Sequence, residues 1–172
     1  YAKIAYDPVR DFSPVTILAS VQNTLVAYPG FGAKSVKELI ALAKSKPGKI
    51  DYASSGNGST QHLTGALFTK MAGIDMKGIP YKGTGPTLVA VMSGEVIAFF
   101  GGSINTTPHV KAGRLRALAV AGDRRAQALP DIPTVAEAGV PGYEVTGWYG
   151  VLAPGGTPRA PVDRLSGEIA KY

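Results

Sequence analysis

The stretch that decides the fold reads Tyr52-Ala-Ser-Ser-Gly-Asn-Gly-Ser-Thr-Gln-His-Leu-Thr-Gly65. It continues a short apolar strand over 50–53, passes through a turn, and enters a helix whose apolar residues are Leu63, Leu67 and Met71. A strand that leads directly into a helix leaves the first helical N–H groups without partners inside the helix. It also places the positive end of the peptide dipoles beside them. The stretch therefore predicts a strand, a turn and a helix whose junction suits an anion.

The turn itself supplies the groups that a carboxylate requires. Its two glycines remove the Cβ atoms that would keep a ligand away from the backbone, and its hydroxyl side chains add donors. The candidate binding residues of this turn are Ser54, Ser55, Gly56, Asn57, Gly58, Ser59 and Thr60. The same residue types are also common in turns that only cap a helix, so this alternative stays open at this point.

The strand-to-helix pattern recurs twice further along the chain. Short strands over 76–79 and 96–100 each run into a loop rich in Gly, Ser or Thr and then into a helix. Strands that alternate with helices predict an α/β fold with a mostly parallel sheet, in which the strands' carboxyl ends share one edge. Ligands bind at such edges. The candidate residues of the second and third loops are Tyr81, Thr84, Gly101, Gly102 and Ser103.

Other local signals place the remaining elements. Ser35 with Glu38, and Thr134 with Glu137, have the spacing of capping boxes and predict helix starts. Gly73 stands where a helix would need a left-handed C-cap. Further strands are expected over 15–19, 24–28, 115–120 and 145–152.

Composition excludes several classes of function. The chain of 172 residues is 45% hydrophobic and 17% charged, which is enough apolar material for a core. Its net charge of +6 favours anionic ligands, but the basic residues are dispersed and not interleaved with aromatics, so no nucleic-acid partner is predicted. The absence of cysteine excludes disulfides and thiolate metal sites. The chain starts at Tyr1 and stops in a helix-like run, so we expect a fragment.

Several stretches together resemble the extracytoplasmic solute-binding proteins of tripartite tricarboxylate transporters, known as the Bug family. The likeness covers nearly the whole chain, and the order and spacing of the stretches make it specific. They are Tyr6-Asp7-Pro8 with Asp11-Phe12, Ser35-Val36-Lys37-Glu38-Leu39, Ser54-Ser55-Gly56-Asn57-Gly58, Pro80-Tyr81-Lys82-Gly83, Lys111-Ala112-Gly113 with Leu115-Arg116-Ala117-Leu118-Ala119-Val120, and Pro133-Thr134-Val135-Ala136-Glu137-Ala138-Gly139.

The resemblance implies a two-lobed periplasmic-binding-protein fold of type II. Such a protein would capture a small carboxylate in the periplasm and present it to the transporter's membrane subunits, without a cofactor or a metal. Residues 28–122 would form the second lobe, with 1–27 and 123–172 as parts of a truncated first lobe. The family's proteins are longer, and the Gly- and Pro-rich loop of their first lobe has no counterpart here.

Carried over by position, residues 54–60 correspond to the family's carboxylate loop. Many relatives read Phe-Asp-Asn where this chain has Phe100-Gly101-Gly102-Ser103, and the loss of that acid favours a plain carboxylic acid over an amino acid. Trp148, on the returning strand, is a further candidate for the lining of the cleft. Aromatic residues on a strand are more often part of the core, so Trp148 and Tyr149 are candidates either for the core or for the lining of the cleft.

Two other classes of function are alternatives to transport. An enzyme is not expected, because His62 and His109 lie in no nucleophile motif and no cluster has metal-ligand spacing. Gly83-Thr84-Gly85 also lacks the full dinucleotide fingerprint. The effector-binding domain of a transcription regulator, which can share the lobed architecture, stays as the alternative. A helix-turn-helix segment would favour that alternative, and none is visible in these residues.

Overall fold

The computed structural model describes residues 4–171 and divides into two compact units. The larger unit is Gln22–Gly147, and the smaller one contains the chain up to Val21 and from Trp148 onward. The larger unit extends past both boundaries expected for the second lobe, 28 and 122. It does so because Ala121 N–H donates to Asn23 O at 2.8 Å and Val145 N–H donates to Ala121 O at 2.7 Å, which ties both flanking segments to the sheet.

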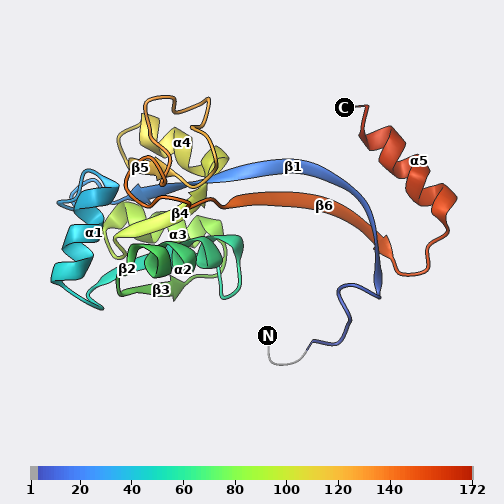
Figure 1. Ribbon diagram of the computed structural model, residues 1–172, viewed down its shortest axis with the longest axis horizontal. Coiled ribbons are helices and arrows are strands. Elements are labelled where there is room, and N and C mark those ends of the chain that lie inside the picture. Colours follow the sequence, from blue (N-terminus) through green and yellow to red (C-terminus); the bar gives the residue numbers. More distant parts are fainter. Residues whose placement is uncertain (1–3, 172) are drawn as a thin grey trace. The chain divides into compact units, whose positions relative to one another are not determined.

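A mixed sheet forms the centre of the larger unit (Figure 1). Its strands run in the order β3-β2-β4-β1-β5. β2 pairs in parallel with β3 and β4, whereas β1 lies antiparallel between β4 and β5. The strands are β1 (Phe12–Ala27), β2 (Ile50–Ser54), β3 (Met76–Pro80), β4 (Ala98–Gly102) and β5 (Arg116–Val120), and the helices are α1 (Val36–Ser45), α2 (Thr60–Ala72), α3 (Thr84–Ser93) and α4 (Ser103–Lys111).

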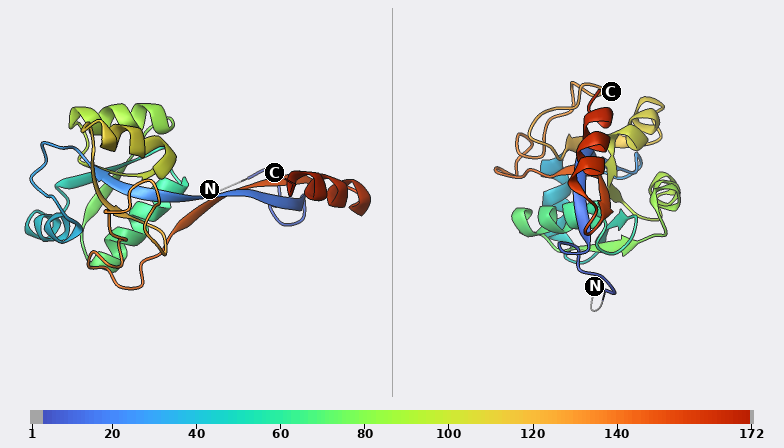
Figure 2. Two further views of the ribbon diagram at one scale, coloured as in Figure 1. Left: turned by 90° about the horizontal axis from the view of Figure 1, so that it is seen from above. Right: turned by 90° about the vertical axis from the view of Figure 1, so that its right-hand side faces the viewer.

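Helices cover both faces of this sheet. Successive side chains of each strand point to opposite faces, so neighbouring residues are buried on different sides. Leu25, Tyr52 and Phe100 belong to the core on the α1 and α2 side. Their strand neighbours Val26 and Phe99 belong to a second core cluster on the α3 side. Figure 2 shows α3 and α4 on one side of the sheet and α1 and α2 on the other. Because both faces are buried, the strands read as apolar runs rather than as alternating ones.

Tyr52 occupies a slot made by two glycines. A Cβ atom on Gly65 of α2 would lie 2.2 Å from a Tyr52 ring carbon, and one on Gly78 of β3 would lie 2.8 Å from the Tyr52 hydroxyl oxygen. The helix approaches the sheet closely here because this face carries small residues. Leu63 and Met71, two of the apolar residues that the sequence places on this helix, are accordingly 59% and 40% exposed. The residues that α2 buries are Thr64, Gly65 and Phe68.

The helix ends follow the sequence signals. Ser35 Oγ accepts from Glu38 N–H at 3.2 Å and caps α1, which confirms the predicted helix start, while Glu38 Oε2 accepts from Lys34 N–H at 2.7 Å instead of from Ser35 N–H. Ser59 caps α2, and Gly73 ends it in the left-handed conformation with φ 61° and ψ 45°. The polypeptide therefore enters and leaves α2 at residues whose chemistry or backbone freedom suits those positions.

Two elements differ from expectation. The runs over 15–19 and 24–28 form one continuous strand, β1, and neither Gly nor Pro lies between them. The second capping box does form, with Glu137 N–H donating to Thr134 Oγ1 at 3.1 Å, but turns follow it instead of an α-helix. The segment is held at the sheet edge, since Val120 N–H donates to Pro133 O at 2.8 Å.

The smaller unit contains the first part of β1, the part of strand β6 (Thr146–Pro154) from Trp148 onward, and the helix α5 (Arg159–Ile169). Gly155 N–H donates to Asp11 O at 2.8 Å and closes one end of this pair. Large apolar side chains on both strands are exposed. Over residues 4–171, no helix combines the length and the apolar character needed to cross a membrane.

Candidate functional site

Three helices begin at the same edge of the sheet in the larger unit. β2, β3 and β4 run in parallel, and α2, α3 and α4 start directly beyond their carboxyl ends. None of these three helices carries an acidic residue in its first turn, whereas α1 carries Glu38 there. Each N-terminus bears roughly half a positive charge, and no first-turn carboxylate offsets it. This edge is therefore suited to an anion.

The first two loops of the edge are hydrogen-bonded to each other. Tyr81 N–H donates to Ser54 O at 2.8 Å, and Gly83 N–H donates to Ser55 O at 3.2 Å. Thr87 Oγ1 adds a longer bond of 3.3 Å to Ser54 O. The structure thus brings together the loops over 54–59 and 81–85.

Free donors remain at the start of α2. The Ser59 hydroxyl accepts from His62 N–H at 3.2 Å, which uses one of the first-turn donors. The N–H groups of Thr60 and Gln61 have no acceptor within the described part of the chain. Thr60 is exposed as a residue. Beneath this turn, Ser54 is fully buried and its Oγ has no hydrogen-bond partner among residues 4–171.

Two residues that the sequence interpretation did not assign to the site hold the glycine-rich turn in shape. Gln61 Oε1 accepts from Ser55 Oγ at 2.8 Å, and His62 Nδ1 accepts from Gly58 N–H at 3.0 Å. Gly58 has φ 76°, a conformation that side-chain-bearing residues rarely adopt. Gly56 and the exposed Asn57 complete the turn. The signal available from sequence was the spacing of four residues that lets the side chain of His62 reach back to Gly58.

The third loop turns toward β1. Ser103 Oγ lies 2.8 Å from Thr24 Oγ1 and donates to Gln22 O at 2.8 Å. Gly101 and Gly102 are buried, and a Cβ atom on Gly101 would lie 2.3 Å from the Phe99 ring. This chain therefore has no room for an acidic side chain at position 101.

Tyr81 and Thr84 lie at the second loop with different surroundings. The Tyr81 ring packs against the core on the α3 side, and its hydroxyl donates to Glu95 Oε1 at 2.7 Å. Partial burial, the hydrogen bond to Glu95 and the charge of Glu95 raise the pKa of Tyr81 to about 12. Thr84 is the first residue of α3 and is half-buried. Tyr81 is thus already engaged through its hydroxyl, and its backbone joins the loops.

Trp148 lies in the smaller unit, so it is described by itself. Its side chain is 63% exposed and that of Tyr149 is 64% exposed. The interpretation of these rings as core residues is therefore wrong for this chain. The role of Trp148 in lining a cleft stays a prediction.

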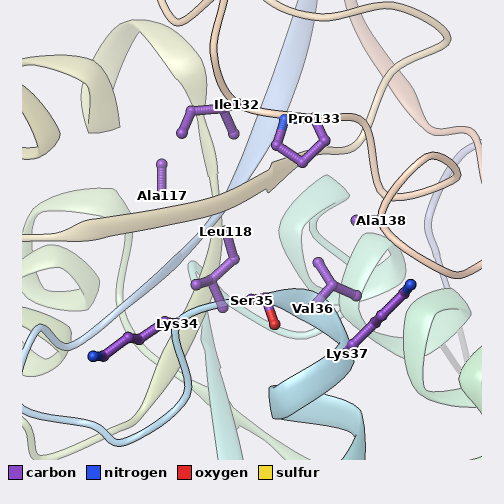
Figure 3. A pocket seen from close by; sticks show the side chains of 9 residues that line it. All are labelled: Lys34, Ser35, Val36, Lys37, Ala117, Leu118, Ile132, Pro133 and Ala138. Carbon is purple, nitrogen blue, oxygen red and sulfur yellow. The ribbon is translucent and has the colours of Figure 1, made fainter.

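A pocket of about 350 Å³ lies apart from the three loops. It is lined by the start of α1, by β5 and by residues 132–138. Figure 3 shows the amines of Lys34 and Lys37 pointing in opposite directions, so its charged groups do not converge. Its remaining wall is mostly apolar, and Ser35 Oγ is used by the α1 cap. The pocket does not present the converging polar groups of an anion site.

The described residues contain no group of three or more His, Asp or Glu side chains that could hold a metal ion. His109 Nδ1 is buried and has no hydrogen-bond partner among residues 4–171. His62 Nδ1 accepts a hydrogen bond from Gly58 N–H. What the edge offers chemically is hydrogen-bond donors and positive helix ends, which bind and orient an anion.

Comparison with known proteins identifies a matching family and several relatives. Residues 1–171 match the family model described as the tripartite tricarboxylate transporter family receptor. A UPF0065 protein from the tcbD-tcbE intergenic region of Pseudomonas sp. is 37% identical over 172 residues, which is 99% of this chain and 51% of that protein. Protein BugT of Bordetella pertussis is 36% identical over 154 residues, covering 90% of this chain and 47% of BugT. The chain thus spans about half the length of the curated relatives it matches.

Solved structures agree with this result. Rpa4515 of R. palustris with adipate matches 99% of this chain and 57% of its own length, with a TM-score of 0.93 and 39% identity. MatC of Rhodopseudomonas palustris with bound malate matches 98% of this chain and 57% of its own, with a TM-score of 0.90 and 33% identity. The periplasmic binding protein BugD matches 95% of this chain and 55% of its own, with a TM-score of 0.87 and 35% identity. The fold is the mixed α/β fold of periplasmic binding proteins, of which this chain holds about half.

Proposed function

The chain belongs to the family of tripartite tricarboxylate transporter receptors, and from that premise we propose that it takes part in capturing a small carboxylate in the periplasm. The captured acid would be handed to the membrane subunits of a secondary transporter. The larger unit is the second lobe of a two-lobed receptor in this proposal, and the smaller unit is part of the first. No chemical step is assigned to the protein.

The observation that carries the proposal is the convergence of three helix N-termini, without an acidic residue in any first turn, at one edge of the sheet. One carboxylate of the ligand would accept from Thr60 and Gln61 N–H and from hydroxyls of the 54–60 turn. Further ligand oxygens would reach Thr84 at the start of α3. Charge-assisted hydrogen bonds of this kind contribute roughly 1.5–3 kcal/mol each before ordering costs are subtracted.

Two relatives support a dicarboxylate as the ligand. One was solved with adipate and the other with malate, and both compounds carry two carboxyl groups. The lack of space for an acid at position 101 also disfavours an ammonium group near the third loop. We therefore propose that a plain dicarboxylic acid binds better than an acidic amino acid of the same length.

Calorimetric titration tests this function. Adipate, malate, citrate, glutamate and a monocarboxylate are titrated into the whole gene product and, separately, into residues 1–172. We expect the dicarboxylates to bind the whole gene product, and glutamate to bind more weakly. Absence of binding by any acid would reject the proposal.

Gly58→Leu provides the matched test of the site. A branched side chain at φ 76° is strained, so the turn should lose its shape and binding should be lost while the fold persists. Gly32→Leu is the control, because Gly32 has open space around it and no positive φ. Equal affinity of the two variants would show that the turn does not hold the ligand.

A further inference from the structure

The side chain of His62 turns back over the glycine-rich turn instead of pointing away from α2. Its Nδ1 accepts from Gly58 N–H at 3.0 Å, four residues earlier in the chain. Its own N–H donates to Ser59 Oγ at 3.2 Å, and its carbonyl accepts from Tyr52 OH at 3.3 Å. The residue is therefore bonded to the turn, to the cap of α2 and to β2.

The ring of His62 is also supported from the neighbouring strand. A Cβ atom on Gly78 of β3 would lie 3.3 Å from His62 Cδ2, which is tighter than an ordinary contact. Any larger residue at position 78 would meet this ring and the Tyr52 hydroxyl together. The imidazole thus lies next to β3 at a glycine and is hydrogen-bonded to the turn.

We propose that His62 is the positioning residue of the carboxylate turn. It holds the Gly56–Ser59 turn against the first turn of α2 and occupies Gly58 N–H, so this amide is not a donor to the ligand. The donors left for the carboxylate are those of Thr60 and Gln61, whose direction the His62 bond keeps fixed. This inference rests on the proposed function for its consequence in binding, but its geometry does not.

The hydrogen bond defines the state of the ring. Nδ1 accepts from an amide, so a ring that makes this bond carries its proton on Nε2. A side chain that offers an acceptor at the same reach should preserve the turn. Asn offers such an oxygen, whereas Phe fills similar space and offers none.

Nuclear magnetic resonance tests the bond directly in residues 1–172, without any ligand. A coupling across the hydrogen bond between the Gly58 and His62 Nδ1 nitrogens, together with an Nε2-protonated ring, is the expected signature. Slow hydrogen exchange of the Gly58 amide should accompany it and should be lost in H62F. An Nδ1-protonated ring, or a Gly58 amide that exchanges equally fast in the wild type and H62F, would overturn the proposal.

Binding tests the consequence in the whole gene product. We expect H62F to weaken adipate binding about tenfold, the effect of one lost positioning hydrogen bond, and H62N to keep most of the affinity. Thermal unfolding of both variants checks that they fold. Wild-type affinity in H62F, or an H62N that binds as poorly as H62F, would overturn the role of the acceptor. If no protein binds any acid while the Gly58 coupling is present, the proposed function fails and the bond stands.

Discussion

Gly65→Ala is the perturbation that tests how α2 is held on the sheet. The added Cβ would lie 2.2 Å from a ring carbon of Tyr52, which is itself only 3% exposed. The ring has little room to retreat, since Gly78 lies on its other side and Phe100 packs edge-on with its ring centroid 6.5 Å away. Inserting a carbon into a packed site costs roughly 1–3 kcal/mol.

A second term opposes this cost. Replacing Gly by Ala inside a helix stabilises the helix by roughly 0.5–1 kcal/mol, because the unfolded chain loses freedom. The two terms leave a net destabilisation of about 1 kcal/mol. For a chain of this length that corresponds to a decrease in Tm of roughly 2–4 °C.

Urea unfolding followed by far-UV circular dichroism measures the change, and hydrogen exchange of the α2 amides localises it. Gly85→Ala is the matched control, because Gly85 is also helical and has nothing within 4 Å of its Cβ position. G85A should be neutral or stabilising. Tyr52→Leu should relieve the clash, so that G65A costs less in that background. A G65A that stabilises as much as G85A would refute the argument that the ring fills the space beside Gly65.

Two further predictions concern the core and the alkaline limit of stability. Phe68→Ala should destabilise the fold by roughly 3–5 kcal/mol, because the ring is fully buried. Leu63→Ala should change the stability by less than about 0.5 kcal/mol, because Leu63 is 59% exposed. The midpoints of denaturant unfolding distinguish the two variants. The pKa of Tyr81 is raised from 10.0 to about 12 by partial burial and Glu95, so its contribution is complete below pH 10 and is lost as the pH rises toward 12. Unfolding measured from pH 9 to pH 12 should therefore show a smaller loss in Y81F than in the wild type, and equal losses would contradict the role of Glu95.

Local signals were sufficient where the chain makes its own bonds. Ser35 and Glu38 lie within one turn of each other, so the start of α1 and its Ser35 cap could be predicted directly and are confirmed. Gly73 is a similar case, since its conformation follows from the end of α2 itself. The resemblance to a family also predicted the fold correctly, because it rests on several motifs in a fixed order and not on a single contact.

Long-range packing was not visible in the sequence. Leu63 and Met71 are apolar residues of α2 and are nevertheless exposed, because the Tyr52 ring needs small residues opposite it and Thr64 and Gly65 take the buried face. The helix after Thr134 failed to form because the segment pairs with Val120, a partner fourteen residues away. The direction of β1, which is antiparallel to its neighbours, likewise depends on strands far along the chain.

The loops of the candidate site were predictable from the sequence, but the side-chain hydrogen bonds within it were less so. Residues 54–60 and the second loop meet as expected, since parallel strands end at one edge. His62 was weighed only as a catalytic base, and its bond to Gly58 was missed because a helix residue that reaches back to its own turn has no periodic signature. The binding roles of the individual residues remain predictions.

The place of β1 has a consequence for how the chain is made. This strand is the first of the larger unit to leave the ribosome, yet Asn23 pairs with Gly102 and Thr24 pairs with Val120. The apolar residues Leu25 and Val26 therefore have no partner strand until Phe99 and Phe100 of β4, 73 and 75 residues later, have been synthesised. Such distant pairing slows folding and leaves the strand exposed to wrong partners in the interval. Production of the protein should accordingly depend on chaperones that shield the nascent segment, and slower translation before residue 120 should lower its yield.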